Sequence, residues 1–204
     1  HWASNWVLRR NHFDCTYGKG FESHNGDYDT SQHHFISDNV FVGPTKWPRK
    51  RGIESFAGVN MTGGGHIVCY NLFKNLGDAV HGRMDAELSA ADFYNNEIHI
   101  CTDDGIETDY SDMNVRVFDN RIVNVIHGVT TQPVRGGPVY VYRNVIYNAT
   151  YTHFKLHNQT SGQLFFHNTC MKNGIPFIIQ NAGEIVTNAW FRNNLFIGTD
   201  GPAF

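Results

Sequence analysis

The asparagines of this chain recur at a regular spacing, and this repeat limits the folds that are open to it. The repeated pattern is apolar, x, x, Asn, x, apolar, and it returns about every 26 residues. In all eight copies, the residue three places before the asparagine and the residue two places after it can be buried. Eight of the 21 asparagines therefore hold one structural position. They are Asn11, Asn39, Asn71, Asn96, Asn120, Asn144, Asn168 and Asn194.

Each repeat unit is expected to contain short strands separated by turns. Asparagine favours turns over helix and strand interiors, and no stretch shows the 3.6-residue period of an amphipathic helix. A second apolar strand follows in most units, as in Gly52-Ile53-Glu54 and Gly105-Ile106-Glu107. Units this small cannot bury their apolar side alone, so they must stack. We predict one all-β solenoid domain over residues 1–204, with about eight coils and a buried, hydrogen-bonded asparagine ladder.

Charge and hydropathy exclude two classes of partner. The chain has 19 acidic and 16 basic residues, and this balance argues against a protein that binds nucleic acid along its phosphates. Its longest apolar runs are far shorter than the roughly 18 residues that a membrane-spanning helix needs. Charged residues make up 17% of the chain, below the roughly 25% of ordinary domains, so a local cluster of charge is notable. The four cysteines show no metal-ligand spacing and are expected to be buried, small apolar residues.

The repeat resembles the right-handed parallel β-helix of the pectin-lyase-like superfamily, and the resemblance covers essentially the whole chain. It depends on the asparagine ladder, the stacked phenylalanine positions and four stretches that are similar to many bacterial β-helix repeat proteins. The resemblance implies a secreted, periplasmic or cell-surface protein whose partner is a polysaccharide. Because solenoids need terminal caps and the sequence shows no capping segment, the chain is expected to be a fragment of a longer β-helix or to have its ends covered by neighbouring chains. Because the superfamily includes lyases, hydrolases, epimerases and non-catalytic adhesins, the fold alone names no reaction. The four stretches are Asp104 to Glu107, Met113 to Asn120, Gly136 to Asn144 and Phe154 to Leu156.

Strand alternation predicts a charged face near the middle of the chain. In the strand after the glycine, the residues between the buried ones point outward, and stacking aligns them from coil to coil. The first outward column is expected to hold Glu22, Glu54, His81, Glu107, Thr130, Lys155 and Ile178, and the second His24, Phe56, Arg83, Asp109, Gln132, His157 and Gln180. Such a column can also be nothing more than the solvated side of a sheet.

If this face is catalytic, β-elimination on a uronate-containing polysaccharide is the leading hypothesis. A calcium ion would stabilise the sugar carboxylate, with Arg83 as an alternative partner for it. A tunable base such as Lys155 or His81 would remove the adjacent proton, and His157 or Lys155 would protonate the leaving oxygen. The candidate catalytic residues are Lys155, His81, Arg83, His157 and Glu107; the candidate substrate-binding residues are Glu54, Asp109, Arg51 and Trp47; the candidate calcium ligands are Glu54, Glu107 and Asp109.

Two alternatives remain open. A glycoside hydrolase needs two carboxyl groups, and Glu107 and Asp109 are about 6.8 Å apart along an ideal strand, while Glu54 and Glu107 are about 9.6 Å apart across two coils. A non-catalytic β-helix would instead bind a glycan or serve as a structural or adhesin module. In that case outward aromatic side chains would stack on sugar rings. Candidates are Tyr140, Tyr142, Tyr147 and Trp190.

Overall fold

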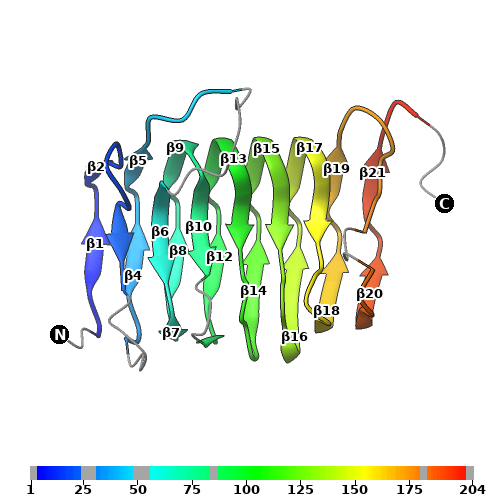
Figure 1. The fold of residues 1–204 in the computed structure, drawn as a ribbon. Helices are drawn as coiled ribbons and strands as arrows, with labels where there is room; N and C mark the ends of the chain where they lie inside the picture. Colours follow the sequence, from blue (N-terminus) through cyan, green and yellow to red (C-terminus); the bar gives the residue numbers. More distant parts are fainter. Residues whose placement is uncertain (1–3, 24–30, 48–55, 83–86, 180–182, 201–204) are drawn as a thin grey trace.

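The computed structural model describes residues 4–23, 31–47, 56–82, 87–179 and 183–200, and they form a parallel β-solenoid (Figure 1). Successive coils follow one another along the solenoid axis in sequence order. None of the described residues is helical, and the described part of the chain thus offers no helix that could cross a membrane. The prediction of an all-β solenoid is confirmed. It has about seven turns rather than eight, because eight ladder positions enclose seven full repeats.

Two long parallel sheets form the walls of the solenoid, and every strand pair between described residues is parallel. The eight-stranded sheet consists of β1 (Val7–Arg9), β4 (Phe35–Ser37), β8 (Ile67–Cys69), β12 (Asp92–Tyr94), β14 (Val115–Phe118), β16 (Arg135–Tyr142), β18 (Ser161–Phe166) and β20 (Thr187–Arg192).

The second sheet has eleven strands and carries the site described below. Its main path runs through β2 (His12–Asp14), β5 (Val40–Val42), β9 (Leu72–Leu76), β13 (Glu97–Glu107), β15 (Arg121–Thr130), β17 (Val145–Lys155), β19 (Thr169–Met171) and β21 (Leu195–Ile197). Three further strands extend it, β3 (Phe21–Glu22), β6 (Ala57–Met61) and β10 (Asp78–Gly82), and β7 (Gly63–Gly64) pairs separately with β11 (Leu88–Ser89).

The asparagine ladder links all the coils. The backbone N–H of Asn96 donates to Asn120 Oδ1 at 3.0 Å, and the Asn96 side-chain amide donates to the same oxygen and to the carbonyl of Val68. The residue before each ladder asparagine has a left-handed φ between 51° and 59°. This turn points the asparagine into the core, where its side chain pairs with backbone groups that burial would otherwise leave unpaired.

Apolar side chains fill the interior in the stacked order that the repeat predicts. The rings of Phe13, Phe41 and Phe73 stack with centroids 4.6 and 4.9 Å apart, and Phe165 stacks on Phe191 at 4.5 Å. All four cysteines are free and buried, as predicted. The core is one continuous cluster along the solenoid.

Ile100 occupies a second repeated position, at which neighbouring coils carry asparagine. Replacing it with asparagine should stabilise the chain. Ile100 has a φ of 67°, while its neighbours in the stack, Asn75, Asn124 and Asn148, have φ values of 58°, 59° and 58°. A β-branched residue is strained in this left-handed region, whereas asparagine tolerates it. We expect Ile100→Asn to raise the free energy of unfolding by about 1 kcal/mol in urea titrations. Val123→Asn, at a nearly buried position without a positive φ, is the control and should destabilise; a less stable Ile100→Asn would contradict the strain argument.

Candidate functional site

Four neighbouring strands, β10, β13, β15 and β17, position the site. Val80 pairs with Ile106, Ile106 with Val129, and Val129 with Phe154. The residues that follow these apolar positions therefore form one column across the coils, in the order expected from the sequence. The column holds His81, Glu107, Thr130 and Lys155.

Glycines precede two of these apolar positions, Ile106 and Val129, and allow the coils to approach closely there. A Cβ atom at Gly105 would lie 2.6 Å from the carbonyl oxygen of Gly128 and 2.8 Å from Cγ2 of Ile122. At Gly128 it would lie 2.6 Å from the carbonyl oxygen of His153. No side chain fits at these distances, so the glycines are needed for the spacing that brings the next residues of the column together.

A second column stands one residue before the glycine position. Asp104 pairs with His127, and His127 with Thr152. Asp78 occupies the same place in the preceding coil, where its Oδ1 accepts a hydrogen bond from the backbone N–H of Asp104 at 2.8 Å. Two adjacent columns of polar side chains therefore meet at the same part of the sheet.

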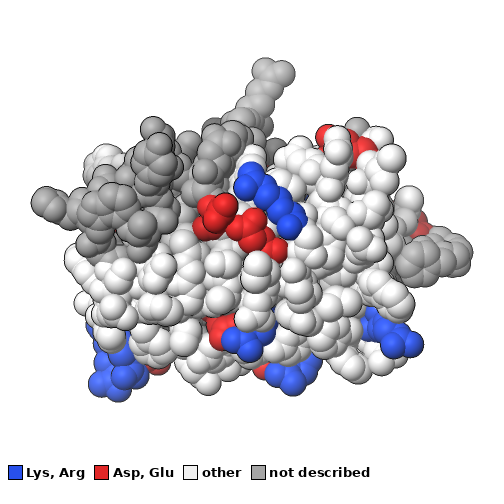
Figure 2. All heavy atoms as spheres, turned by 90° about the horizontal axis from the view of Figure 1, so that it is seen from below, with Lys and Arg blue, Asp and Glu red and all other residues white. Residues whose placement is uncertain are grey.

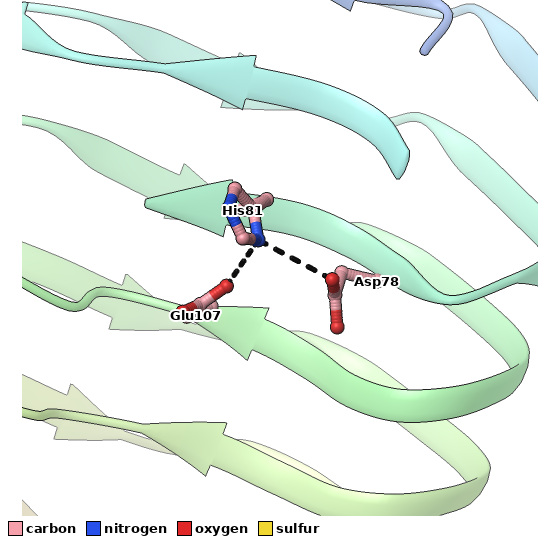
Figure 3. Close-up of side chains that lie close together, drawn as sticks. All are labelled: Asp78, His81 and Glu107. Atoms are coloured by element: carbon pink, nitrogen blue, oxygen red, sulfur yellow. Dashed lines mark hydrogen bonds and ion pairs between the residues drawn. The ribbon is translucent and has the colours of Figure 1, made fainter. Parts of the chain in front are cut away.

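His81 contacts two carboxylates at the surface of this cluster (Figure 3). Its Nδ1 lies 3.3 Å from Asp78 Oδ2 and closer still to Glu107 Oε2. The facing atoms of the three residues lie within 4.8 Å of one another. The His81 side chain is 33% exposed, while those of Asp78 and Glu107 are 11% exposed each. His81 is therefore the most exposed side chain of this group.

A second group extends the cluster across β13, β15 and β17. Lys155 Nζ is 3.3 Å from Asp104 Oδ2, and the two side chains are only 13% and 3% exposed. The Thr130 hydroxyl lies 3.3 Å from the same Asp104 oxygen and 3.1 Å from Asp109 Oδ1, so it can donate to one of them at a time. The backbone N–H of Gln132 donates to Asp109 Oδ1 at 2.9 Å. Lys155 is thus held against carboxyl groups from neighbouring coils.

Burial raises the pKa of the carboxyl groups. It raises the pKa of Asp104 well above its usual range, more than the charge of Lys155 lowers it. Burial does the same to the pKa of Asp109, and the charge of Glu107 and a hydrogen bond to its carboxyl raise it further. The pKa of Glu107 is also raised by burial, against the opposing effect of His81. These three carboxyl groups therefore hold their protons to a higher pH than exposed carboxyl groups do.

The two cations of the cluster keep their protons. Burial lowers the pKa of His81, but hydrogen bonds to Asp78 and Glu107 and their charges outweigh it and raise the pKa to about 10. Burial likewise lowers the pKa of Lys155, but the charges of nearby carboxylates, Asp104 first, raise it overall. Acidic and basic side chains also lie side by side near the centre of the face in Figure 2, which is otherwise largely uncharged.

Four of the predicted site residues are brought together, namely His81, Glu107, Asp109 and Lys155. His157 lies nearby, and burial and then the charge of Lys155 lower its pKa. Trp47 is half-buried after β5, outside the four strands that position the cluster. Arg51, Glu54 and Arg83 lie outside the described residues.

Three details of the predicted face are corrected by the structure. Asn60, and not Glu54, stands in the column between Glu22 and His81, because β6 provides the strand of that coil. Asp109 was expected to point into solvent but is buried, since the chain turns after β13 and folds it under Gln132. Glu107 and Asp109 are hydrogen-bonded rather than separated by the strand spacing, so they are too close to act as a catalytic pair on opposite sides of a sugar.

Sequence reasoning missed Asp78, Asp104 and His127 as site residues. Each directly precedes the small residue that starts the second strand, in Asp78-Ala79, Asp104-Gly105 and His127-Gly128. The same alignment that found Glu107 and Lys155 contains this column one position earlier. Reading that column would have found the second half of the cluster.

Calcium fits the described residues poorly. Two groups of side chains have a spacing suited to a metal ion, but calcium prefers about six to eight oxygen ligands and each group includes a histidine. Imidazolium and ammonium groups of the protein already neutralise acids in the cluster. We therefore assign no step to calcium. The two groups are Asp78, His81 and Glu107, and Asp103, Asp104 and His127.

The outward aromatic side chains are used mainly for stacking between coils. Tyr94, Phe118, Tyr142 and Phe166 form a continuous stack with centroids 4.8 to 5.1 Å apart and planes within 10° of parallel. Both faces of the Tyr142 ring are therefore covered and cannot stack on a sugar. Tyr147 and Trp190 remain 50% and 59% exposed.

No protein-family model, curated protein or solved structure matches this chain. The fold is therefore given by the strand pairing itself, and the chemistry must be inferred from the side chains of the cluster.

Proposed function

We propose that this chain cleaves a polysaccharide at the charged cluster, and that it does so by hydrolysis with two carboxyl groups. The observation that carries the proposal is the surface group in which His81 joins Asp78 and Glu107, next to the buried carboxyl group of Asp109, which is hydrogen-bonded to Glu107. A relationship to the pectin-lyase-like superfamily, expected from the sequence, is part of the same proposal. We also propose an acidic, uronate-containing substrate, because the partly exposed His81 imidazolium would attract a sugar carboxylate.

Glu107 is the proposed general acid. Burial raises its pKa, and the proton that it passes to the leaving glycosidic oxygen is supplied by the His81 imidazolium, whose Nδ1 contacts Glu107 Oε2. Asp78 is the proposed nucleophile, the second carboxyl group of a retaining pair. The facing oxygens of Asp78 and Glu107 lie no more than 4.8 Å apart, which is shorter than the roughly 6.5–9.5 Å of inverting pairs, so a retaining arrangement is proposed.

Hydrolysis is favoured over β-elimination by the protonation state of the cations. A lyase needs a base to remove the proton beside the sugar carboxylate, and Lys155 and His81 were the expected bases. With the pKa of His81 at about 10 and that of Lys155 raised, both are protonated near neutral pH and cannot accept that proton. They can instead orient the substrate and stabilise ionised carboxylates.

Polysaccharide cleavage by wild type and a Glu107→Gln variant tests the proposal. A panel of neutral and uronate-containing polysaccharides should yield new reducing ends without the ultraviolet absorbance of unsaturated sugars, with or without calcium. We expect Glu107→Gln to cleave about a hundredfold more slowly, because it cannot release a proton. The matched control is Glu97→Gln on the same strand, whose carboxylate pairs with Arg121 and His99 away from the cluster.

The outcomes separate the possible functions. Unsaturated products would replace hydrolysis by β-elimination. A folded Glu107→Gln variant with wild-type activity would remove Glu107 from the chemistry. If the folded wild-type chain released no ends from any polysaccharide of the panel, the non-catalytic binding role would take the place of an enzyme.

A further inference from the structure

A half-open pocket of about 320 Å³ lies on the second sheet, away from the charged cluster. Residues from β17, β19 and β21 and the turns that follow them line it, at the yellow to red end of Figure 1. Its volume is at the lower end of the roughly 300–1,000 Å³ of small-molecule sites. Among its lining residues are Tyr147, Asn148, Lys172, Asn173, Ile197 and Thr199.

Lys172 is the unusual residue of this pocket. It is only 8% exposed, and its Nζ donates a hydrogen bond to the carbonyl oxygen of Tyr151 at 2.7 Å. An ammonium group has three donors, so this bond leaves two of them for other partners. None of the ion pairs between described residues includes Lys172.

A buried ammonium without a carboxylate is costly, because burial removes its hydration and nothing of opposite charge replaces it. Burial alone lowers the pKa of Lys172. The nearby His153 supplies no counter-charge, since burial and then the positive charge of Lys172 lower its pKa to about 4. The other lysine of this sheet's buried part, Lys155, is by contrast paired with Asp104. An anion supplied from outside would restore the balance at Lys172.

We propose that this pocket binds a small sugar acid, with the carboxylate of the ligand paired to Lys172. The site is separate from the charged cluster and does not depend on the proposed hydrolysis.

The remaining walls of the pocket favour a hydroxylated ring over a bare anion. Tyr147 is 50% exposed and offers an aromatic surface on which a sugar ring can pack. The Thr199 hydroxyl donates to Asn173 Oδ1 at 2.7 Å, which leaves the Asn173 amide nitrogen as a donor for ligand hydroxyls. Ile197 and Met171 supply apolar contacts beside them. Charge, ring surface and amide groups within a volume of this size match a monosaccharide acid.

Calorimetric titration with glucuronate, glucose and inorganic phosphate tests this site. Glucuronate should bind to the wild-type chain, and glucose and phosphate should bind at least tenfold more weakly. Lys172→Met keeps the apolar stem and removes the charge, and it should weaken glucuronate binding by about 10- to 100-fold, as expected for a hydrogen-bonded charge pair. The matched control is Lys74→Met, an exposed lysine on β9 of the same sheet.

A nuclear magnetic resonance titration of the wild-type chain locates the ligand even if Lys172→Met fails to fold. We expect glucuronate to shift the amide signals of Asn173, Gly198 and Thr199 and to leave those of His81 and Glu107 unchanged. Equal binding of glucose or phosphate would overturn the assignment to a sugar acid. Wild-type affinity in a folded Lys172→Met variant, absence of glucuronate binding, or shifts confined to the charged cluster would each overturn the site itself.

Glu107→Gln separates this proposal from the proposed hydrolysis. The variant should lose cleavage and retain glucuronate binding. Loss of both together would place the ligand in the charged cluster and remove the pocket at Lys172 from consideration.

Discussion

Asn120→Ala is expected to lower the free energy of unfolding by about 4 kcal/mol, measured by urea titration at neutral pH. The side chain of Asn120 accepts hydrogen bonds from the backbone and the side chain of Asn96. It donates to the carbonyl of Phe93 and to Asn144 Oδ1, at 2.9 and 3.0 Å. Alanine removes all four bonds at once.

The cost comes mainly from the groups that are left behind. The N–H of Asn96 and the carbonyl of Phe93 are at the centre of the stack, and a buried backbone group without a partner costs about 1–3 kcal/mol. Because neighbouring coils are stabilised chiefly by their shared interfaces, a broken rung in the middle also weakens the coupling between the two halves of the solenoid.

Asn11→Ala is the matched control, because Asn11 is an exposed rung of the same ladder. Its side chain donates to Asn39 Oδ1 at 3.1 Å and to the carbonyl of Arg9, but water can replace these bonds. We expect a loss of about 1 kcal/mol or less. Equal losses in Asn11→Ala and Asn120→Ala would contradict the view that buried backbone groups make the ladder necessary.

The same ladder explains how much of the structure could be predicted. The repeat determines both the fold class and the register between strands of successive coils. Each asparagine must lie directly above the next one for its side chain to find a hydrogen-bond partner. Once the register is fixed, the column of His81, Glu107, Thr130 and Lys155 follows from counting.

The sequence-based predictions were wrong where the repeat can be aligned in two ways, or where a turn follows the strand. Gly52-Ile53-Glu54 and Gly58-Val59-Asn60 carry the same glycine-apolar-polar pattern six residues apart in the longest unit, and only pairing in space selects the second. Asp109 follows the end of β13, so strand alternation no longer tells which way its side chain points. The raised pKa of His81 could not be predicted from the first column alone, because it depends on Asp78, which lies in a different column.

The solenoid should lose stability as the pH falls from about 6.5 to about 4, because two histidines are buried in their neutral form. Burial lowers the pKa of His66 and of His153 to about 4 each. In His66, a ring nitrogen lies 2.8 Å from the Thr62 carbonyl oxygen, which can only accept, while Nδ1 accepts the backbone N–H of His34 at 3.2 Å. Both nitrogens are therefore used in a way that only the neutral ring allows.

The direction of the change in stability with pH follows from the number of protons bound by the folded and the unfolded chain. Between pH 6.5 and 4 the unfolded chain binds a proton at each histidine and the folded chain does not, so stability falls with falling pH. Below about pH 4 both states are protonated and the loss levels off at about 3 kcal/mol for each histidine. The positive charges that His33 and His34 would acquire add to the penalty at His66, and Lys172 does the same at His153.

Acidic groups of the charged cluster act in the opposite direction, so variants are needed to isolate the histidines. The pKa values of Asp104, Glu107 and Asp109 are raised on folding, and their protonation at lower pH therefore favours the folded chain. Urea titrations at a series of pH values should show a shallower loss of stability in His66→Gln and in His153→Gln than in the wild-type chain. His12→Gln, at an exposed strand position, should leave the slope unchanged. If His66→Gln and His153→Gln kept the wild-type slope, the acid sensitivity would belong to other groups, and burial of the neutral rings would not be its cause.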